Sequence, residues 1–338
     1  MSLSLLLRAI VIAVQMTHGG NVPEEHFYVT LESSGLKLFL RHQPTTQTGP
    51  ASERPPVLIL HGSTLPSALS AANRIDGESW MDDLAKRGFD VWALDFLGFG
   101  GSDRYREMTE NPTTHAPLGR AREAVDQVAA AVNFILAKRH ASRIEIIAHS
   151  WGTIPAGIFT ARSPKIVDRL VQFGPVVTRN VRRDTTIVPA WSAITPEDRL
   201  AGLAGLVPAG VGAVLEPAYA ATFAASYLAS DPGSSTRTPH SIALPSGPDA
   251  DLLDMWSGVQ LYDPEKIVVP VLIIRGEWDS ITTDADARRL FDQLRNTVKR
   301  DVKISRATHV MQLEQPRHQL YAEVASFLTE RFATSPNP

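Results

Sequence analysis

Three polar residues that lie far apart in the sequence have the side chains that nucleophilic catalysis needs: a serine, an aspartate and a histidine. Ser150 follows a largely apolar, strand-like pattern over residues 144–149, and Ala148 and Gly152 flank it two positions away on either side. A serine at a sharp strand-to-helix turn projects its hydroxyl away from the backbone only if both flanking positions are small. A serine in this place could also be an ordinary helix N-cap. The pattern makes Ser150 a candidate nucleophile, and its partners decide between the two roles.

Candidate partners for Ser150 lie downstream, each in a turn after a strand-like run. Asp279 follows the apolar residues 268–274, and His309 follows the shorter run of residues 302–305. A serine hydroxyl is a weak nucleophile unless a base takes its proton, and His309 is the candidate base. Asp279 would orient the imidazole and stabilise its positive charge. The chain order serine, aspartate, histidine differs from the orders in chymotrypsin and subtilisin and matches a third known arrangement, which favours catalysis over capping.

Other acids and histidines compete for these roles. Glu277 lies two residues before Asp279 and would replace it if the register of the loop differed. Asp95 also ends an apolar run, but it precedes the serine in the chain and fits a turn motif. His149 adjoins the serine, where a side chain is expected to point elsewhere, and His61 is expected to anchor a neighbouring loop. The serine, aspartate and histidine named above therefore form the predicted catalytic set.

The segments around these residues alternate between strand-like and helix-like patterns. The strand-like patterns of residues 27–32 and 36–42 predict a hairpin around a Ser-Ser-Gly turn. Residues 78–87 and 118–140 carry apolar side chains at helical spacing, which predicts two helices that face a core. Alternation of this kind favours an α/β fold with a doubly wound sheet.

Several motifs, taken in order, resemble the α/β-hydrolase superfamily. Residues 56–62, Pro-Val-Leu-Ile-Leu-His-Gly, are similar to the family's strand that ends in His-Gly. Residues 91–103 contain Asp-x-x-Gly-x-Gly-x-Ser, and residues 161–175 resemble the helix end and strand that follow the family's nucleophile turn. The resemblance extends from Phe27 to Phe332. It implies the α/β-hydrolase fold, a mostly parallel, doubly wound sheet with a helical cap inserted after the sixth strand.

The resemblance also divides the chain into parts. Residues 26–175 and 267–338 would form the hydrolase core, and residues 1–25 would precede it as an N-terminal segment. Residues 176–266, which are rich in Ala, Gly and Pro, would form a cap or lid over the active site. Aromatic side chains of this cap are candidates for substrate binding, although such residues also hold a segment of this kind together. The four candidates are Trp191, Tyr219, Phe223 and Trp256.

A tetrahedral oxyanion would be stabilised by hydrogen-bond donors that already point at it. One expected donor is the backbone N–H of Trp151, because it directly follows the nucleophile at the start of a helix. The resemblance implies that the second is Ser63, in the loop after the His-Gly pair, with Thr64 as the neighbouring alternative.

These assignments lead to one expected activity and several alternatives. We expect a serine hydrolase that cleaves a small or medium carboxylic ester through an acyl-enzyme on Ser150, with a lactone or an amide as alternative substrates. Residues 150–153, Ser-Trp-Gly-Thr, are similar to the nucleophile turn of proline iminopeptidases, but the Gly-Gly before their serine and their His-Gly-Gly-Pro-Gly loop are absent. A carbon–carbon bond hydrolase would use the same three residues. Outside enzymes, the alternative is a hydrolase-fold receptor that binds a ligand with little turnover.

The composition limits the expected partners and cofactors. The 338 residues include no cysteine and carry a net charge of −3. The absence of cysteine excludes disulfides, thiolate chemistry and Cys-based zinc sites, and nucleic acid is not an expected partner without a positive surplus. The glycines of residues 98–101 lack the full Gly-x-Gly-x-x-Gly spacing. We expect a small-molecule substrate and neither a cofactor nor a metal, and the sequence leaves the oligomeric state open.

The apolar N-terminus raises the question of membrane attachment or export. Its uninterrupted apolar run, residues 9–14, is shorter than the roughly 20 residues that a spanning helix needs. Residues 15–20 match a signal-peptidase site poorly. We therefore expect no stable membrane span and a cytoplasmic protein, with secretion or a periplasmic location as the alternative in which residues 1–20 act as a signal.

Overall fold

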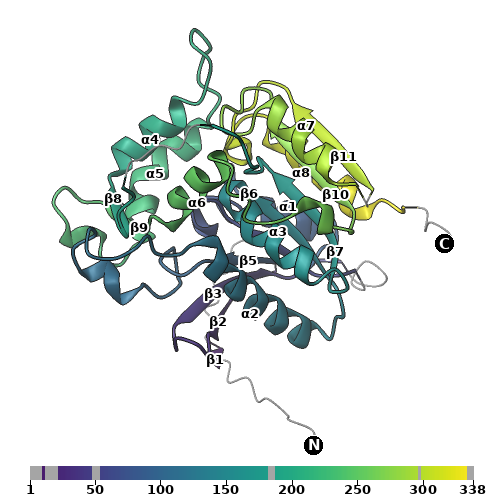
Figure 1. The fold of residues 1–338 in the computed structure, drawn as a ribbon, viewed down its shortest axis with the longest axis horizontal. Helices are drawn as coiled ribbons and strands as arrows, with labels where there is room; N and C mark the ends of the chain where they lie inside the picture. The colour runs from purple at the N-terminus through teal and green to yellow at the C-terminus, as the bar shows by residue number, and fades with distance from the viewer. Residues whose placement is uncertain (1–9, 12–21, 48–53, 182–186, 296–297, 333–338) are drawn as a thin grey trace, which may run out of the picture.

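A nine-stranded β-sheet forms the centre of the described part of the molecule (Figure 1). The computed structural model describes the chain except for residues 1–9, 12–21, 48–53, 182–186, 296–297 and 333–338. From edge to edge the strands are β1 (Ile10–Val11), β2 (Glu25–Thr30), β3 (Lys37–Gln43), β5 (Val91–Asp95), β4 (Val57–Leu60), β6 (Ile144–His149), β7 (Val167–Phe173), β10 (Val271–Gly276) and β11 (Lys299–Ile304). The six strands from β5 to β11 in this order run parallel, and β1, β2 and β3 form an antiparallel edge.

Burial on both faces explains the continuous apolar runs of the inner strands. Every residue of β4, β5 and β10 is buried, as expected for parallel strands that helices cover on both sides. Strand β2, in the antiparallel part of the sheet, instead alternates between more and less exposed positions. The predicted mostly parallel, doubly wound sheet is confirmed.

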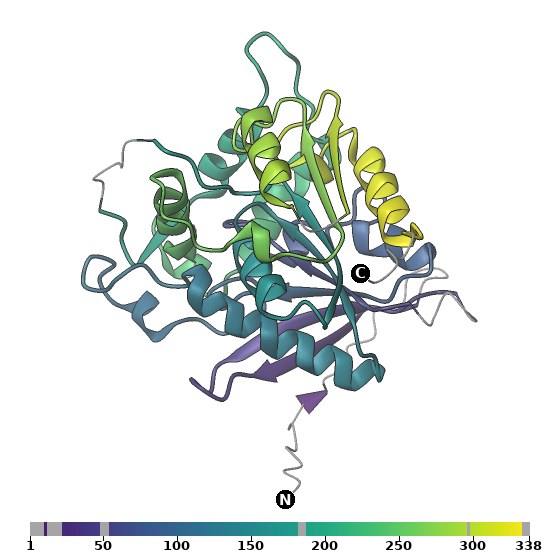
Figure 2. The same cartoon turned by 45° about the vertical axis from the view of Figure 1, so that its right-hand side comes forward.

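Helices cover both faces of this sheet (Figure 2). On one face, apolar side chains of α1 (Trp80–Lys86) and α8 (Arg317–Thr329) join a buried cluster with alternate residues of the strands. On the other face, α2 (Ala121–Arg139), α3 (Thr153–Arg162) and α7 (Asp284–Gln293) join a second, larger cluster. The two helices predicted around residues 78–87 and 118–140 are therefore present as α1 and α2.

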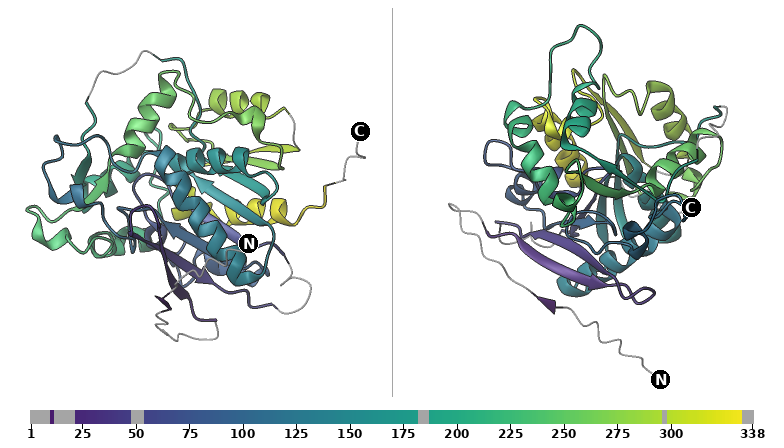
Figure 3. Two further views of the ribbon diagram at one scale, coloured as in Figure 1. Left: turned by 60° about the horizontal axis from the view of Figure 1, so that its bottom comes forward. Right: turned by 90° about the vertical axis from the view of Figure 1, so that its left-hand side faces the viewer.

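A long segment between β7 and β10 departs from the strand–helix alternation. It contains β8 (Trp191–Ile194), α4 (Pro196–Ala204), α5 (Pro217–Ala229), β9 (Ile242–Pro245) and α6 (Gly247–Trp256). The strands β8 and β9 form a separate antiparallel pair, and α4 contacts α5. The segment gathers at one side of the molecule (Figures 1 and 3). We call residues 176–266 the inserted segment.

Most of the N-terminal segment, residues 1–25, lies outside the described residues. Ile10 and Val11 pair with Tyr28 and Phe27 of β2 in antiparallel register. Among the described residues, no helix has both the length and the apolar character needed to cross a membrane.

Candidate active site

Neighbouring parallel strands bring the three predicted catalytic residues to one edge of the sheet. β6, β7, β10 and β11 lie side by side. Ser150 directly follows β6, Asp279 follows β10 and His309 follows β11. Because the carboxyl ends of parallel strands meet at the same edge, the three loops converge there.

Ser150 has a strained backbone conformation at a crowded turn. Its φ is +54°, in the left-handed region that costs a residue with a side chain about 1–2 kcal/mol. A Cβ at Gly152 would lie 2.4 Å from the carbonyl oxygen of His61, and a Cβ at Gly62 would lie 3.0 Å from Cβ of Ser150. The close approach of the two loops explains why both positions hold glycine. The turn between β6 and α3 projects the serine away from the sheet, as its flanking small residues predicted.

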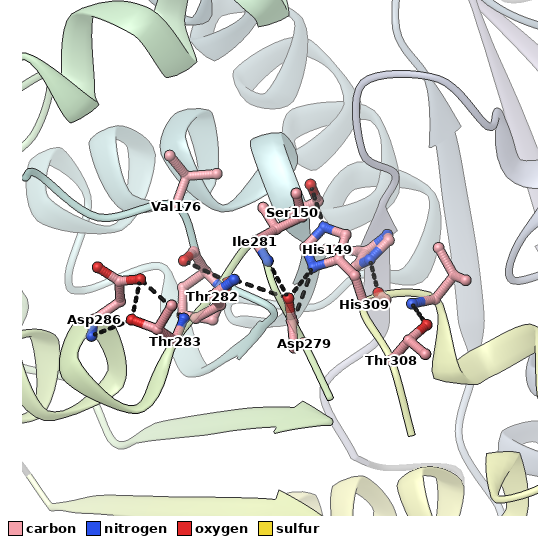
Figure 4. A network of polar contacts seen from close by, with 12 residues as sticks. His149, Ser150, Val176, Asp279, Ile281, Thr282, Thr283, Asp286, Thr308 and His309 are labelled. Atoms are coloured by element: carbon pink, nitrogen blue, oxygen red, sulfur yellow. Dashed lines mark hydrogen bonds and ion pairs between the residues drawn. The ribbon is translucent and has the colours of Figure 1, made fainter. Parts of the chain in front are cut away.

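The side chains of Ser150, His309 and Asp279 form a continuous chain of hydrogen bonds (Figure 4). Oγ of Ser150 lies 2.8 Å from Nε2 of His309. Nδ1 of His309 lies 2.9 Å from Oδ2 and 3.1 Å from Oδ1 of Asp279. All three residues are buried. With a proton on Nδ1, donated to the carboxylate, Nε2 is left to accept the serine proton.

Two backbone amides hold the Asp279 carboxylate in place. Oδ1 accepts hydrogen bonds from the N–H of Ile281 at 2.9 Å and of Thr282 at 2.8 Å. Burial acts to raise the pKa of Asp279, but the charge and hydrogen bond of His309, together with the two amides, lower it below its ordinary value. The carboxylate is therefore ionised and oriented toward the imidazole.

Two glycines allow the loops that carry Asp279 and His309 to lie against the sheet. Gly174, directly after β7, has a φ of +55°. A Cβ at this position would lie 2.9 Å from the imidazole of His309 and 3.3 Å from Oδ2 of Asp279. A Cβ at Gly276 would lie 2.2 Å from the carbonyl oxygen of Ala307. The space at these two positions determines how closely the acid and the base approach each other.

His149 contacts the histidine loop, although the sequence predicted that its side chain points elsewhere. Its ring stacks on Phe173 with 4.3 Å between centroids, and its Nε2 donates to the backbone carbonyl of His309 at 2.8 Å. Burial, reinforced by the charge of His309, lowers the pKa of His149 to about 3. The ring is therefore neutral near pH 7 and supports the loop of His309 as a hydrogen-bond donor.

A cavity of about 180 Å³ opens beside Ser150. Ser63 and Thr64 form part of its wall, and Ser63 forms no hydrogen bond with any described residue. The amide of Trp151 lies in the first turn of a short 3₁₀ helix, Ser150–Gly152, where a backbone N–H has no partner within the helix. The rest of the wall is mainly apolar and comes from Leu65, Leu203, Leu206, Leu252, Ile281 and Val310.

Comparison with known proteins identifies the family of the chain. A family model described as alpha/beta hydrolase fold matches residues 55–316. The chain belongs to the α/β-hydrolase family. No curated protein matches the hydrolase in sequence.

Solved structures share the fold of the hydrolase at low sequence identity. The thioesterase domain from the curacin biosynthetic pathway has a TM-score of 0.61 and 15% identity, over 91% of this chain and 100% of the other. A 2-hydroxy-6-oxo-6-phenylhexa-2,4-dienoate hydrolase from Rhodococcus sp. strain RHA1 has a TM-score of 0.61 and 18% identity, over 91% and 100%. An esterase from Exiguobacterium antarcticum has a TM-score of 0.60 and 15% identity, over 90% and 99%. At these identities the similarity shows the fold.

The four aromatic residues predicted to bind substrate lie elsewhere in the hydrolase and do not line the cavity beside Ser150. Trp191 donates its indole N–H to the carbonyl of Glu110, and Trp256 lies under the guanidinium of Arg179. The rings of Tyr219 and Phe223 are buried against each other on α5. Tyr219 and Phe223 therefore pack the interior of the inserted segment, whereas Trp191 attaches it to the core and Trp256 contacts Arg179 within it.

A face of α4 lines the cavity instead, and the sequence analysis missed it. Arg199, Gly202 and Leu203 of α4 border the cavity, as does Leu206, which lies two residues beyond the end of the helix. Gly202 and Leu203 follow Arg199 by three and four residues, and this spacing places the three residues on one side of α4. Thr195 accepts a hydrogen bond from the N–H of Asp198 as an N-cap, with Pro196 next to it. The Thr-Pro start and the helical spacing were the signals that could have identified this wall.

The competing acids and histidine have other roles. Glu277 is exposed and accepts hydrogen bonds from Ser305 and the amide of Arg306. Asp95 accepts hydrogen bonds from backbone amides of two loops. His61 accepts from the N–H of Phe96 at 3.1 Å and donates through Nδ1 to the carbonyl of Gly62 at 2.6 Å, so it anchors the loop before Ser63. Among the described residues, no group of three His, Cys, Asp or Glu side chains could hold a metal ion.

Proposed function

We propose that this hydrolase cleaves small or medium carboxylic esters through an acyl-enzyme on Ser150. The observation that carries the proposal is the chain of hydrogen bonds from Ser150 through His309 to Asp279, beside a cavity of about 180 Å³. A hydroxyl, a base and a buried carboxylate in this order meet the geometric requirement for an activated serine.

The proposed reaction begins when a substrate carbonyl occupies the cavity. His309 takes the Ser150 proton at Nε2 as Oγ attacks the carbonyl carbon, and Asp279 stabilises the resulting imidazolium. The imidazolium then gives this proton to the leaving alkoxide, which departs as an alcohol. Water, activated by the same imidazole, attacks the acyl group and releases the acid. An amide would follow the same steps with an amine as the leaving group, and in a lactone the protonated alcohol would stay attached to the acyl group until water releases the hydroxy acid.

We assign the oxyanion hole to the backbone N–H groups of Trp151 and Ser63. The first lies at the start of the helix after the nucleophile, and the second borders the cavity without another hydrogen-bond partner among the described residues. Loss of one such donor typically costs about 3–4 kcal/mol of transition-state stabilisation.

In this proposal residues 26–175 and 267–338 form the catalytic core, and the inserted segment acts as a cap. Support comes from the cavity wall, because α4 and α6 contribute Leu203 and Leu252 opposite residues of the core such as Ser63 and Val310. Apolar walls of this kind exclude water from the reaction and bind an apolar acyl chain.

Hydrolysis of 4-nitrophenyl esters from acetate to decanoate, followed with pre-steady-state resolution, tests the proposed function. We expect a burst of 4-nitrophenol, then turnover with an optimum at short or medium chain length, and loss of both in Ser150→Ala. Background rates for every ester, from protein shown to be folded, would refute the ester assignment. Turnover of peptides or of a carbon–carbon substrate would then identify one of the other triad chemistries, and tight binding unaffected by Ser150→Ala would indicate a receptor.

A further inference from the structure

Arg199 is a positively charged residue in an otherwise largely apolar wall of the cavity beside Ser150. It lies on α4 and borders the same cavity as the nucleophile. Its Nε is buried and has no hydrogen-bond partner among the described residues. The Tyr227 hydroxyl is buried near the guanidinium, but within the described part of the chain it too has no hydrogen-bond partner of normal geometry. A buried donor without an acceptor costs about 1–3 kcal/mol, so a feature this unfavourable calls for an explanation.

The other arginines show that Arg199 is an exception. Every other arginine with a partly or fully buried side chain in the described part of the chain donates a hydrogen bond or forms an ion pair: Arg41, Arg54, Arg104, Arg120, Arg169, Arg179, Arg237, Arg275, Arg300 and Arg317. Desolvation raises the pKa of Asp249 on α6, and the charge of Arg199 partly offsets this effect. The Asp249 carboxylate therefore lies near the guanidinium of Arg199. Asp249 nevertheless forms no ion pair with Arg199.

An anionic group of the substrate would supply the missing partner. A guanidinium binds a carboxylate through parallel N–H donors and keeps its charge at every relevant pH. A single cation balances one carboxylate, whereas a phosphate dianion needs more donors than this small apolar wall offers. We propose that Arg199 binds a carboxylate of the substrate, so that the preferred substrates are esters that carry a free acid. This inference rests on the proposed function at Ser150.

Matched ester pairs test the inference through a ratio of specificity constants. The 4-nitrophenyl monoester of adipic acid is compared with its methyl-capped, neutral counterpart, and 4-carboxyphenyl butyrate is compared with phenyl butyrate. The first pair places the carboxylate on the acyl side and the second on the leaving-group side. We expect kcat/KM for the acid in one of these pairs to exceed that of its neutral partner about 10- to 100-fold, the range of a charge-assisted hydrogen bond.

Two variants assign this preference to Arg199. Arg199→Met keeps the length and apolar bulk of the side chain and should reduce the acid-to-neutral ratio to about one. Arg162→Met removes an exposed arginine at the end of α3, outside the cavity, and should leave the ratio unchanged. A wild-type ratio near one for both pairs would overturn the proposal. So would a high ratio that survives in Arg199→Met.

The failure of this inference is distinguishable from the failure of the proposed function. If neutral esters are cleaved through Ser150 but no acid is preferred, only the carboxylate site is refuted. If no ester is cleaved, calorimetric titration of adipate and of 4-hydroxybenzoate into Ser150→Ala tests the site alone. If adipate or 4-hydroxybenzoate binds to Ser150→Ala but not to the double variant Ser150→Ala, Arg199→Met, the carboxylate site is supported. If neither compound binds to Ser150→Ala, the site is refuted.

Discussion

Replacement of Asp279 by asparagine should inactivate the hydrolase without unfolding it. The N–H groups of Ile281 and Thr282 both donate to Oδ1, so the new side chain should place its carbonyl oxygen there. Its NH₂ group then occupies the Oδ2 position, 2.9 Å from Nδ1 of His309. A donor at this point requires Nδ1 to be the acceptor, which moves the imidazole proton to Nε2. An Nε2–H that faces Ser150 donates a proton and takes none.

The expected loss follows from this inverted tautomer. Triads with this change lose about 10⁴-fold in kcat, equivalent to about 5.4 kcal/mol at about 1.36 kcal/mol per tenfold. The variant keeps both amide hydrogen bonds, so its free energy of unfolding should stay within about 1 kcal/mol of wild type.

The assay is kcat on 4-nitrophenyl butyrate, together with urea unfolding. Asp286→Asn is the matched control, since Asp286 is also a buried aspartate that accepts a backbone hydrogen bond, from Thr283, and pairs with Arg179. This control should lose stability and keep kcat within about threefold, because it lies outside the hydrogen-bonded chain. A folded Asp279→Asn protein with kcat within tenfold of wild type would refute the tautomer argument.

Two further predictions concern the supports of the histidine loop. Gly174→Ala should lower kcat about 100-fold, because the new Cβ would lie 2.9 Å from the imidazole of His309 and small displacements of catalytic groups are costly. Gly35→Ala is the control, since Gly35 also has a positive φ, +73°, but its Cβ would have no neighbour within 4 Å. This control should lose a similar stability, about 1–2 kcal/mol, and keep its kcat. Equal kcat in the two variants, measured beside urea unfolding, would contradict this account. His149 has a folded-state pKa of about 3, below the roughly 6.5 of an unfolded histidine. The contribution of the neutral ring to the free energy of unfolding is therefore fully present above pH 6.5, and it falls by about 1.4 kcal/mol per pH unit as the pH drops toward 3. His149→Gln, which keeps a donor and does not titrate, should flatten the dependence of unfolding free energy on pH between 6.5 and 5, and an unchanged slope would refute the neutral, buried state of the ring.

The sequence predicted those parts of the structure that follow from local pattern. Inner strands such as β4 are buried on both faces and therefore have uninterrupted apolar runs. The turn at Ser150 requires small flanking residues, and parallel strands place their following loops at one edge. These regularities explain why the sheet and the meeting of Ser150, Asp279 and His309 could be predicted.

The inserted segment could not be predicted in the same way, because its structure depends on contacts between distant residues. The buried hydroxyl of Tyr219 donates to the carbonyl of Leu69 in the core, 150 residues away in the chain. On α6, Asp251 turns toward the core and accepts from the indole of Trp151, whereas the adjacent Leu252 borders the cavity. Aromatic content alone indicated a packed segment, and only the fold shows which face of each helix meets the cavity.

His149 shows a further limit of local reasoning. Its position next to the nucleophile was clear, but its hydrogen-bond acceptor is the carbonyl of His309, which lies 160 residues away in the chain. No short-range pattern encodes such a contact.

The proposed mechanism requires Ser150 to form a covalent acyl-enzyme. The most direct test is to quench the reaction with 4-nitrophenyl butyrate in acid during the burst and to measure the mass of the intact protein, followed by peptide mapping. We expect a mass increase of one butyryl group, located on Ser150 and absent from Ser150→Ala. Turnover with no acylated protein, or with the acyl group on another residue, would contradict it.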